Sequence, residues 1–259
     1  MLRDKITKKI ICGNWKMNPR SSKEAEKLFN DVVRNISEIK KTNIVICPPF
    51  LYLDKVKKIS KKIVLGAQDD FPGDVGAFTG EVSAEMLYNL GVRYVILGHS
   101  ERRALGENDG DINKKIKSSL AMGLRPILCV GERERNDNHD YFNLIKMQLE
   151  DCLDGVSKNN AVKIIIAYEP IWAISSTKDR KDATPNDSSE MAIFIRRVLF
   201  TKFGKDSSNV KILYGGSVGE KNAEDFLKDG GIDGLLVGRA SLDAKKFSQI
   251  IKICEALDK

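Results

Sequence analysis

The chain has 259 residues, of which 42% are hydrophobic and 31% are charged, with a formal net charge of +7. This apolar content excludes a mainly disordered chain, and no apolar run approaches the roughly 18 residues of a membrane helix. The basic excess is mild and mixed with acids, which favours small anionic partners over a nucleic-acid surface. The charged start at residues 1–5 lacks a signal-peptide core, so we expect the cytoplasm. The five scattered cysteines form no CxxC pair and predict neither a metal site nor a disulfide framework.

Short apolar runs alternate with longer amphipathic segments along the whole chain. Runs this short and this apolar indicate strands that are buried on both faces and therefore parallel. The eight runs begin in order at Lys9, Ile44, Ile63, Tyr94, Pro126, Val162, Ile212 and Gly234.

Helical patterns follow most of these runs. They cover residues 22–40, 109–122, a segment opened by Thr184 and Pro185, 221–228 and 242–257. Eight strand–helix units in about 250 residues predict one α/β domain over 1–259, a closed (β/α)8 barrel. An open doubly wound sheet is the alternative, but its glycine fingerprint is missing after the first run, where 13–17 reads Gly-Asn-Trp-Lys-Met.

Polar residues follow several of the predicted strands, at the end of the barrel where active sites lie. Asn14 and Lys16 follow the first run, His99 the fourth and Glu169 the sixth. An amide, an ammonium, an imidazole and a carboxylate at one mouth suit the binding of a small anion and proton transfer beside a carbonyl. The glycine-rich segment 215–217 follows the seventh run and predicts a phosphate cradle.

Five segments resemble the triosephosphate isomerase family, and they occur in the family's order over roughly residues 9–257. They are Asn-Trp-Lys-Met-Asn at 14–18, Gly-Ala-Phe-Thr-Gly-Glu at 76–81, Gly-His-Ser-Glu-Arg-Arg at 98–103, Tyr-Glu-Pro-Ile-Trp-Ala-Ile at 168–174 and Tyr-Gly-Gly-Ser-Val at 214–218. The resemblance implies a glycolytic and gluconeogenic isomerase that interconverts D-glyceraldehyde 3-phosphate and dihydroxyacetone phosphate. It implies no cofactor, because the reaction has no redox step.

The resemblance also implies a role for each residue at the mouth. Glu169 would move the proton between two carbons of the substrate, and His99 would polarise the carbonyl as a neutral electrophile. Lys16 would offset negative charge, and Asn14 would hydrogen-bond the substrate. Glu101 would orient Lys16. Glu101 and Ser100 would contact the catalytic residues without touching the substrate. The phosphate would be held by Ser175, Ser217, Gly238 and Arg239.

The resemblance further implies a lid over about residues 170–183. Its first hinge would be Pro170, Ile171 and Trp172. Ile174 and Leu236 would desolvate the base, and Tyr214 and Ser217 would hold the lid closed. Two departures stand out: residues 175–180 read Ser-Ser-Thr-Lys-Asp-Arg in place of a shorter glycine-containing tip, and Arg239 stands where a second glycine is usual.

The long loop at about residues 68–81 resembles the family's dimerisation loop. The resemblance implies a homodimer, with Phe71 as an apolar anchor and Thr79 reaching toward Asn14 and Glu101 of the second subunit. The alternative is a surface Ω-loop on a monomer.

Two other functions compete with the isomerase. One is another phosphate-binding barrel enzyme, against which the set Asn14, Lys16, His99 and Glu169 argues. The other is a catalytically impaired phosphate-binding barrel or binding protein, which only the altered lid tip supports.

Overall fold

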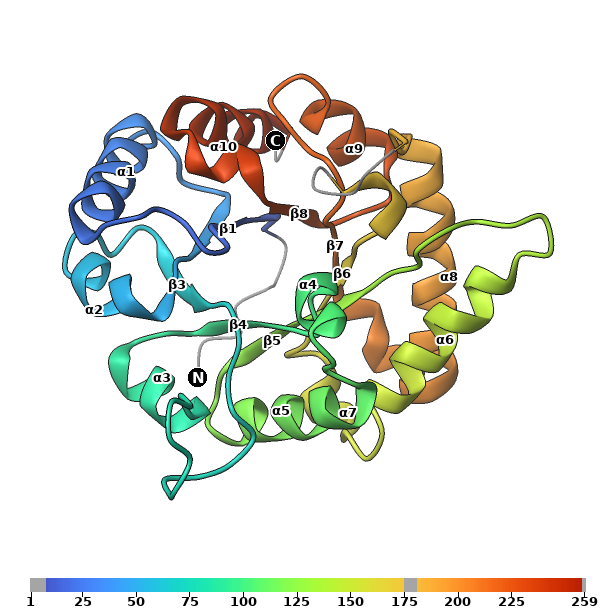
Figure 1. The fold of residues 1–259 in the computed structure, drawn as a ribbon. Helices are drawn as coiled ribbons and strands as arrows, with labels where there is room; N and C mark the ends of the chain where they lie inside the picture. The colour runs from blue at the N-terminus through green and yellow to red at the C-terminus, as the bar shows by residue number, and fades with distance from the viewer. Residues whose placement is uncertain (1–7, 175–180, 258–259) are drawn as a thin grey trace.

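The computed structural model describes residues 8–174 and 181–257, in which eight parallel strands close into a barrel (Figure 1). Each strand pairs with its neighbours in chain order, and β1 pairs with β8 to complete the ring. The strands are β1 Ile10–Asn14, β2 Asn43–Cys47, β3 Val64–Ala67, β4 Tyr94–Leu97, β5 Arg125–Val130, β6 Ile165–Tyr168, β7 Lys211–Tyr214 and β8 Gly234–Val237.

Helices surround this barrel and cover its outer face (Figure 1). The α-helices are α1 Ser22–Asn35, α2 Phe50–Lys57, α3 Ala84–Leu90, α4 Ser100–Ala104, α5 Asp109–Ala121, α6 Asp140–Cys152, α7 Lys158–Ala161, α8 Pro185–Phe203, α9 Ala223–Asp229 and α10 Ala244–Leu257. Short 3-10 helices are η1 Ile171–Ala173, η2 Gly204–Asn209 and η3 Arg239–Leu242.

Alternation along each strand divides the core into two layers. In β1, Ile10 and Cys12 belong to the cluster inside the barrel, whereas Ile11 packs into the larger cluster between barrel and helices. All five residues of β1 are buried. Burial on both faces explains why these strands lack polar alternation, and it confirms the predicted (β/α)8 barrel.

The ends of several elements differ from the sequence prediction. The sixth strand begins at Ile165, not at Val162, because residues 158–161 form the helical turn α7 and Val162 ends it. The first helix ends at Asn35, although Ile36 and Ile39 remain buried beyond it. The start of α8 follows the prediction: Thr184 caps it with Pro185 at the first helical position.

Among the helices of residues 8–174 and 181–257, none combines the length and the apolar character needed to cross a membrane.

Candidate active site

A cavity of about 420 Å³ opens at the carboxyl ends of the strands. All four predicted catalytic residues line it together: Asn14, Lys16, His99 and Glu169. The closed barrel brings these residues to one place, since the carboxyl ends of parallel strands face the same side. The cavity is also lined by Ile174, Gly215, Gly216, Ser217, Val218, Gly219, Glu220, Leu236, Gly238, Arg239, Ala240, Leu242, Asp243 and Lys246.

Glu169 directly follows β6 and is 3% exposed. Its Oε1 lies 3.2 Å from Nε2 of His99, and its Oε2 lies 3.5 Å from the backbone nitrogen of Ser100. Burial alone would raise the pKa of Glu169, but the nearby His99 and Lys16 outweigh it and lower that pKa. The group is therefore an ionised carboxylate with little water around it, as a general base requires.

Two glycines leave the space that Glu169 occupies. A Cβ on Gly131 would lie 1.9 Å from the carbonyl oxygen of Glu169, and one on Gly215 would lie 2.7 Å from its Cγ. Any side chain at Gly131 would therefore collide with the backbone of the base. The sequence analysis gave Gly131 no role, and the only available signal was its position directly after a predicted strand.

His99 is the N-cap residue of α4, and 6% of its surface is exposed. Its Nδ1 accepts a hydrogen bond from the backbone N–H of Glu101 at 3.2 Å. An acceptor nitrogen carries no proton, so the ring proton lies on Nε2, which faces Glu169. Burial lowers the pKa of His99, while the adjacent Glu169 carboxylate raises it and prevails. The backbone donor at Nδ1 opposes full protonation of the ring and leaves Nε2 as the hydrogen-bond donor.

Lys16 has an uncommon backbone conformation that contacts with three other residues stabilise. Its φ of 53° lies in the left-handed region, and Oδ1 of Asn14 accepts its N–H at 3.0 Å. The amide of Gln68 donates to its carbonyl oxygen at 2.9 Å, and Nζ pairs with Oε1 of Glu101 at 2.7 Å. These three contacts hold Lys16 in an uncommon backbone conformation, and its ammonium group points toward the cavity.

Three of the predicted phosphate residues, Ser217, Gly238 and Arg239, also line the cavity. Ser217 donates its backbone N–H to Ala173 at 3.1 Å, which joins the β7 loop to η1. A Cβ on Gly238 would lie 3.6 Å from Cε of Lys16, so this glycine and the lysine are close neighbours. Arg239 begins η3 at the rim without positive φ, and therefore needs no glycine there. Ser175 lies outside the described residues.

The predicted lid residues divide into two groups. Ile174 and Leu236 are buried and line the cavity beside Glu169. Tyr214 does not line it; its ring stacks on Phe226, with centroids 4.1 Å apart. Pro170 precedes η1, and the backbone N–H of Lys181 donates to the carbonyl of Trp172 at 3.0 Å.

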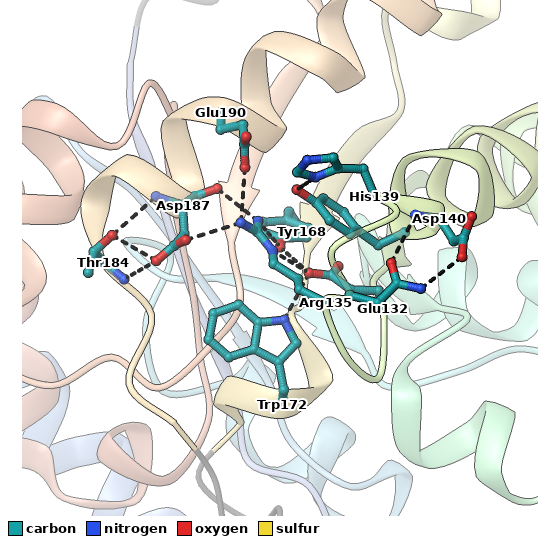
Figure 2. A network of polar contacts seen from close by, with 11 residues as sticks. Glu132, Arg135, His139, Asp140, Tyr168, Trp172, Thr184, Asp187 and Glu190 are labelled. Atoms are coloured by element: carbon teal, nitrogen blue, oxygen red, sulfur yellow. Dashed lines mark hydrogen bonds and ion pairs between the residues drawn. The ribbon is translucent and has the colours of Figure 1, made fainter.

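A polar network missed by the sequence analysis includes Tyr168 and Trp172, which lie on either side of Glu169 in the chain (Figure 2). Glu132 Oε1 accepts hydrogen bonds from the hydroxyl of Tyr168 at 2.8 Å, Nε1 of Trp172 at 2.9 Å and Nε of Arg135 at 3.1 Å. Arg135 also reaches Asp187 in the first turn of α8. The one signal in the sequence was the position of Glu132, two residues after a predicted strand; Arg135 had none.

The two predicted interface residues of the 68–81 loop differ in their exposure to solvent. Phe71 is half-buried and packs on Phe78, with ring centroids 4.5 Å apart. Its backbone N–H donates to Val82, so Phe71 also helps to hold the loop together. Thr79 is exposed.

A closed parallel eight-stranded barrel with a carboxylate, an imidazole and an ammonium group around one cavity at its carboxyl face defines a class, the (β/α)8-barrel enzymes. Comparison with known proteins narrows this class. The family model for triosephosphate isomerase matches residues 9–254. The chain belongs to the triosephosphate isomerase family, and it is therefore an isomerase.

Curated relatives and a solved structure agree with this assignment. Triosephosphate isomerase from Thermoanaerobacter sp. (strain X514) is 42% identical over 247 residues, covering 93% of this chain and 98% of the relative. The one from Aquifex aeolicus is 44% identical over 248 residues, covering 94% and 98%. The crystal structure of triosephosphate isomerase from Bartonella henselae has a TM-score of 0.82 at 34% identity and covers 95% of this chain and 98% of that one.

Proposed function

We propose that the chain interconverts D-glyceraldehyde 3-phosphate and dihydroxyacetone phosphate, with Glu169 as the base and His99 as the electrophile. The observation that carries this proposal is the convergence of Glu169, His99, Lys16 and Asn14 on one cavity, with Glu169 Oε1 only 3.2 Å from His99 Nε2. The family's reaction belongs to glycolysis and gluconeogenesis, and we expect the chain to work in the cytoplasm.

The reaction proceeds by transfer of one proton between neighbouring carbons. Glu169 removes a proton from the carbon beside the carbonyl, and His99 donates a hydrogen bond from Nε2 to the carbonyl oxygen as negative charge develops there. His99 gives its Nε2 proton to the former carbonyl oxygen and takes a proton from the hydroxyl oxygen of the adjacent carbon, while that carbon takes the first proton back from Glu169. The carboxylate and the imidazole return to their starting states, so no other reactant is consumed.

Lys16 and Asn14 complete the electrostatic part of the site. The Lys16 ammonium offsets the charge of the phosphate and of the enediolate oxygen, and Asn14 hydrogen-bonds the substrate. Ser217, Gly238 and Arg239, which line the cavity, hold the phosphate, with Ser175 as a further expected contact. We retain the expectation that the segment 170–183 acts as a lid, with Ile174 and Leu236 as the apolar groups that keep water from Glu169.

Isomerase activity of the purified chain tests the proposal. Glu169→Gln keeps the shape of the side chain but removes its basicity, so we expect kcat to fall by about 100- to 10,000-fold. Glu38→Gln is the matched control, because Glu38 is exposed beyond the end of α1. A Glu169→Gln variant that is as fast as Glu38→Gln would contradict the proposal.

We also propose that the active form is a homodimer built on the loop 68–81, with Phe71 and Thr79 as in the family. Large apolar side chains are exposed after the carboxyl ends of β1 to β4, where a second subunit would cover them. They are Met17 at 93% exposure, Leu51 at 85%, Val75 at 81%, Phe78 at 50% and Leu105 at 82%. Sedimentation equilibrium should give twice the 28.9 kDa mass of one chain; a mass of one chain at micromolar concentration would contradict the dimer.

A further inference from the structure

Arg135, in the loop between β5 and α6, joins three other parts of the molecule (Figure 2). Its Nε donates to Glu132 Oε1 at 3.1 Å, and Nη2 donates to the hydroxyl of Tyr168 at 3.1 Å. Its Nη1 donates to Oδ1 of Asp187 at 3.1 Å and to Oε2 of Glu190 at 2.9 Å, both in α8. The side chain is 19% exposed. A planar fork with five donors is the group that can satisfy so many acceptors at once.

One branch of this network reaches the residue before the base. Tyr168 ends β6 and immediately precedes Glu169. Its hydroxyl accepts from Arg135 and donates to Glu132 at 2.8 Å. Burial and the neighbouring Glu132 carboxylate raise the pKa of Tyr168, so the hydroxyl keeps the proton that it donates.

A second branch reaches η1, which follows the base. Trp172 donates from Nε1 to Glu132 Oε1 at 2.9 Å, and the guanidinium carbon of Arg135 lies 5.5 Å from the Trp172 ring centroid. The backbone N–H of Ile171 also donates to the carbonyl of Glu132 at 2.8 Å. The backbone on both sides of Glu169 is thus fastened to the Glu132–Arg135 pair.

The third branch fastens the beginning of α8. One carboxylate oxygen of Asp187 accepts a hydrogen bond from the backbone N–H of Thr184 at 2.8 Å. The other oxygen accepts a hydrogen bond from Arg135. The guanidinium forms ion pairs with three carboxylates, those of Glu132, Asp187 and Glu190. Glu132 is 1% exposed, so loss of Arg135 would leave a buried carboxylate without the counter-charge 3.1 Å away.

We propose that Arg135 is a positioning residue for the isomerisation: it fixes Tyr168 and Trp172, on either side of Glu169, against the start of α8. This inference rests on the proposed function. Arg135 does not line the cavity, whereas Glu169 and Ile174 do. Its effect on the reaction is therefore indirect: it sets the positions of these two side chains. A carboxylate displaced by about 1 Å from its working position costs up to a hundredfold in rate.

Arg135→Gln, Arg135→Lys and the control Arg133→Gln test the proposal. Arg133 is an exposed arginine two residues away in the same loop. We expect Arg135→Gln to lower kcat by about 10- to 100-fold with a smaller change in KM, and Arg135→Lys to recover part of the loss because it restores the charge without the fork. Arg133→Gln should behave as the unaltered chain does.

Two further readouts separate positioning from a general loss of structure. A misplaced Ile174 and Glu169 admit water to the enediolate, which then breaks its carbon–oxygen bond to phosphate, so inorganic phosphate released per isomerisation should increase in Arg135→Gln. The emission of Trp172 should also shift, whereas the buried Trp15, the other tryptophan of the chain, should not respond. Subtracting spectra of Trp172→Phe isolates the signal.

The proposal is overturned if Arg135→Gln matches Arg133→Gln in kcat and in phosphate release. If Arg135→Gln fails to fold, Asp187→Asn supplies the same test, because it removes one contact of the guanidinium and keeps the helix. The proposed function has its own test: it would be contradicted if the unaltered chain had no isomerase activity. The Trp172 emission would then still show whether Arg135 holds η1.

Discussion

Two clusters of largely buried charged groups differ in the pKa of their carboxylates. The mouth cluster consists of Glu169, His99 and Lys16. The loop cluster joins the start of the 68–81 loop to α5 and consists of Asp69, Asp70, Glu107, Lys115 and Ser119. Glu169 is 3% exposed and Asp70 is 2% exposed, so burial does not distinguish the two acids.

The difference lies in the partners. His99 and Lys16 overcome the effect of burial and lower the pKa of Glu169. Asp70 has a neutral partner, the hydroxyl of Ser119 at 2.6 Å, and within the described residues its Oδ1 has no hydrogen-bond partner. Burial, with the nearby Asp69 carboxylate, raises the pKa of Asp70 to about 7. The charges that face a buried acid therefore decide whether it is ionised and can act as a base or stays protonated.

The largest expected effect is at the mouth. His99→Gln removes the donor at Nε2, and we expect kcat to fall by about 100- to 10,000-fold, with unchanged unfolding in urea. His139→Gln is the control, because His139 is the other histidine and lies exposed at the start of α6. Equal activities of the two variants would remove His99 from the mechanism.

The second effect is a pH dependence of stability set by Asp70. The pKa of Asp70 is about 7 in the folded protein and about 3.9 in an unfolded chain, so between these values the folded state binds more protons. Stability therefore falls as pH rises from 4 to 7, by an amount on the order of 4 kcal/mol through this group. Asp70→Asn should remove this fall. Urea unfolding at pH 4.5, 6 and 8 measures it, and parallel curves for the two proteins would refute the assignment.

Lys115 gives the third effect. Its Nζ lies 2.7 Å from Asp69 and also pairs with Glu107, and these two acids outweigh burial and raise the pKa of the lysine. Lys115→Met should cost about 3 kcal/mol in the free energy of unfolding, because both acids lose a buried counter-charge. Lys114→Met, on the exposed side of the same helix, should cost less than about 0.5 kcal/mol. Similar costs for both variants would mean that the loop cluster contributes nothing specific.

The smallest effect is expected from Ser119→Ala. This variant removes the hydrogen bond from the Ser119 hydroxyl to Asp70 and should cost about 1–2 kcal/mol in unfolding free energy. It should also extend the fall in stability to higher pH, since the hydroxyl lowers the pKa of Asp70. A Ser119→Ala curve whose fall ends at a lower pH than that of the unaltered chain would contradict this account.

The two clusters also differ in how far the sequence predicted them. Each residue of the mouth cluster follows a strand, and a parallel barrel brings all strand ends to one face, so local pattern and fold class were enough to unite Asn14, Lys16, His99 and Glu169. For the loop cluster the sequence indicated only the long loop at about residues 68–81. The structure buries Asp70 against Ser119, which is 49 residues away, and packs Phe71 on Phe78.

The sequence by itself determined the eight buried strands, the cap of α8 and the set of residues at the mouth, because these depend on periodicity and on position relative to a strand. Only the tertiary structure decided that Arg135 joins Glu132 to Asp187 and that Asp70 holds a raised pKa. Those contacts join side chains far apart in the chain, with Arg135 and Asp187 separated by 52 residues. Their energy depends on distance and burial, which no local pattern of residues specifies.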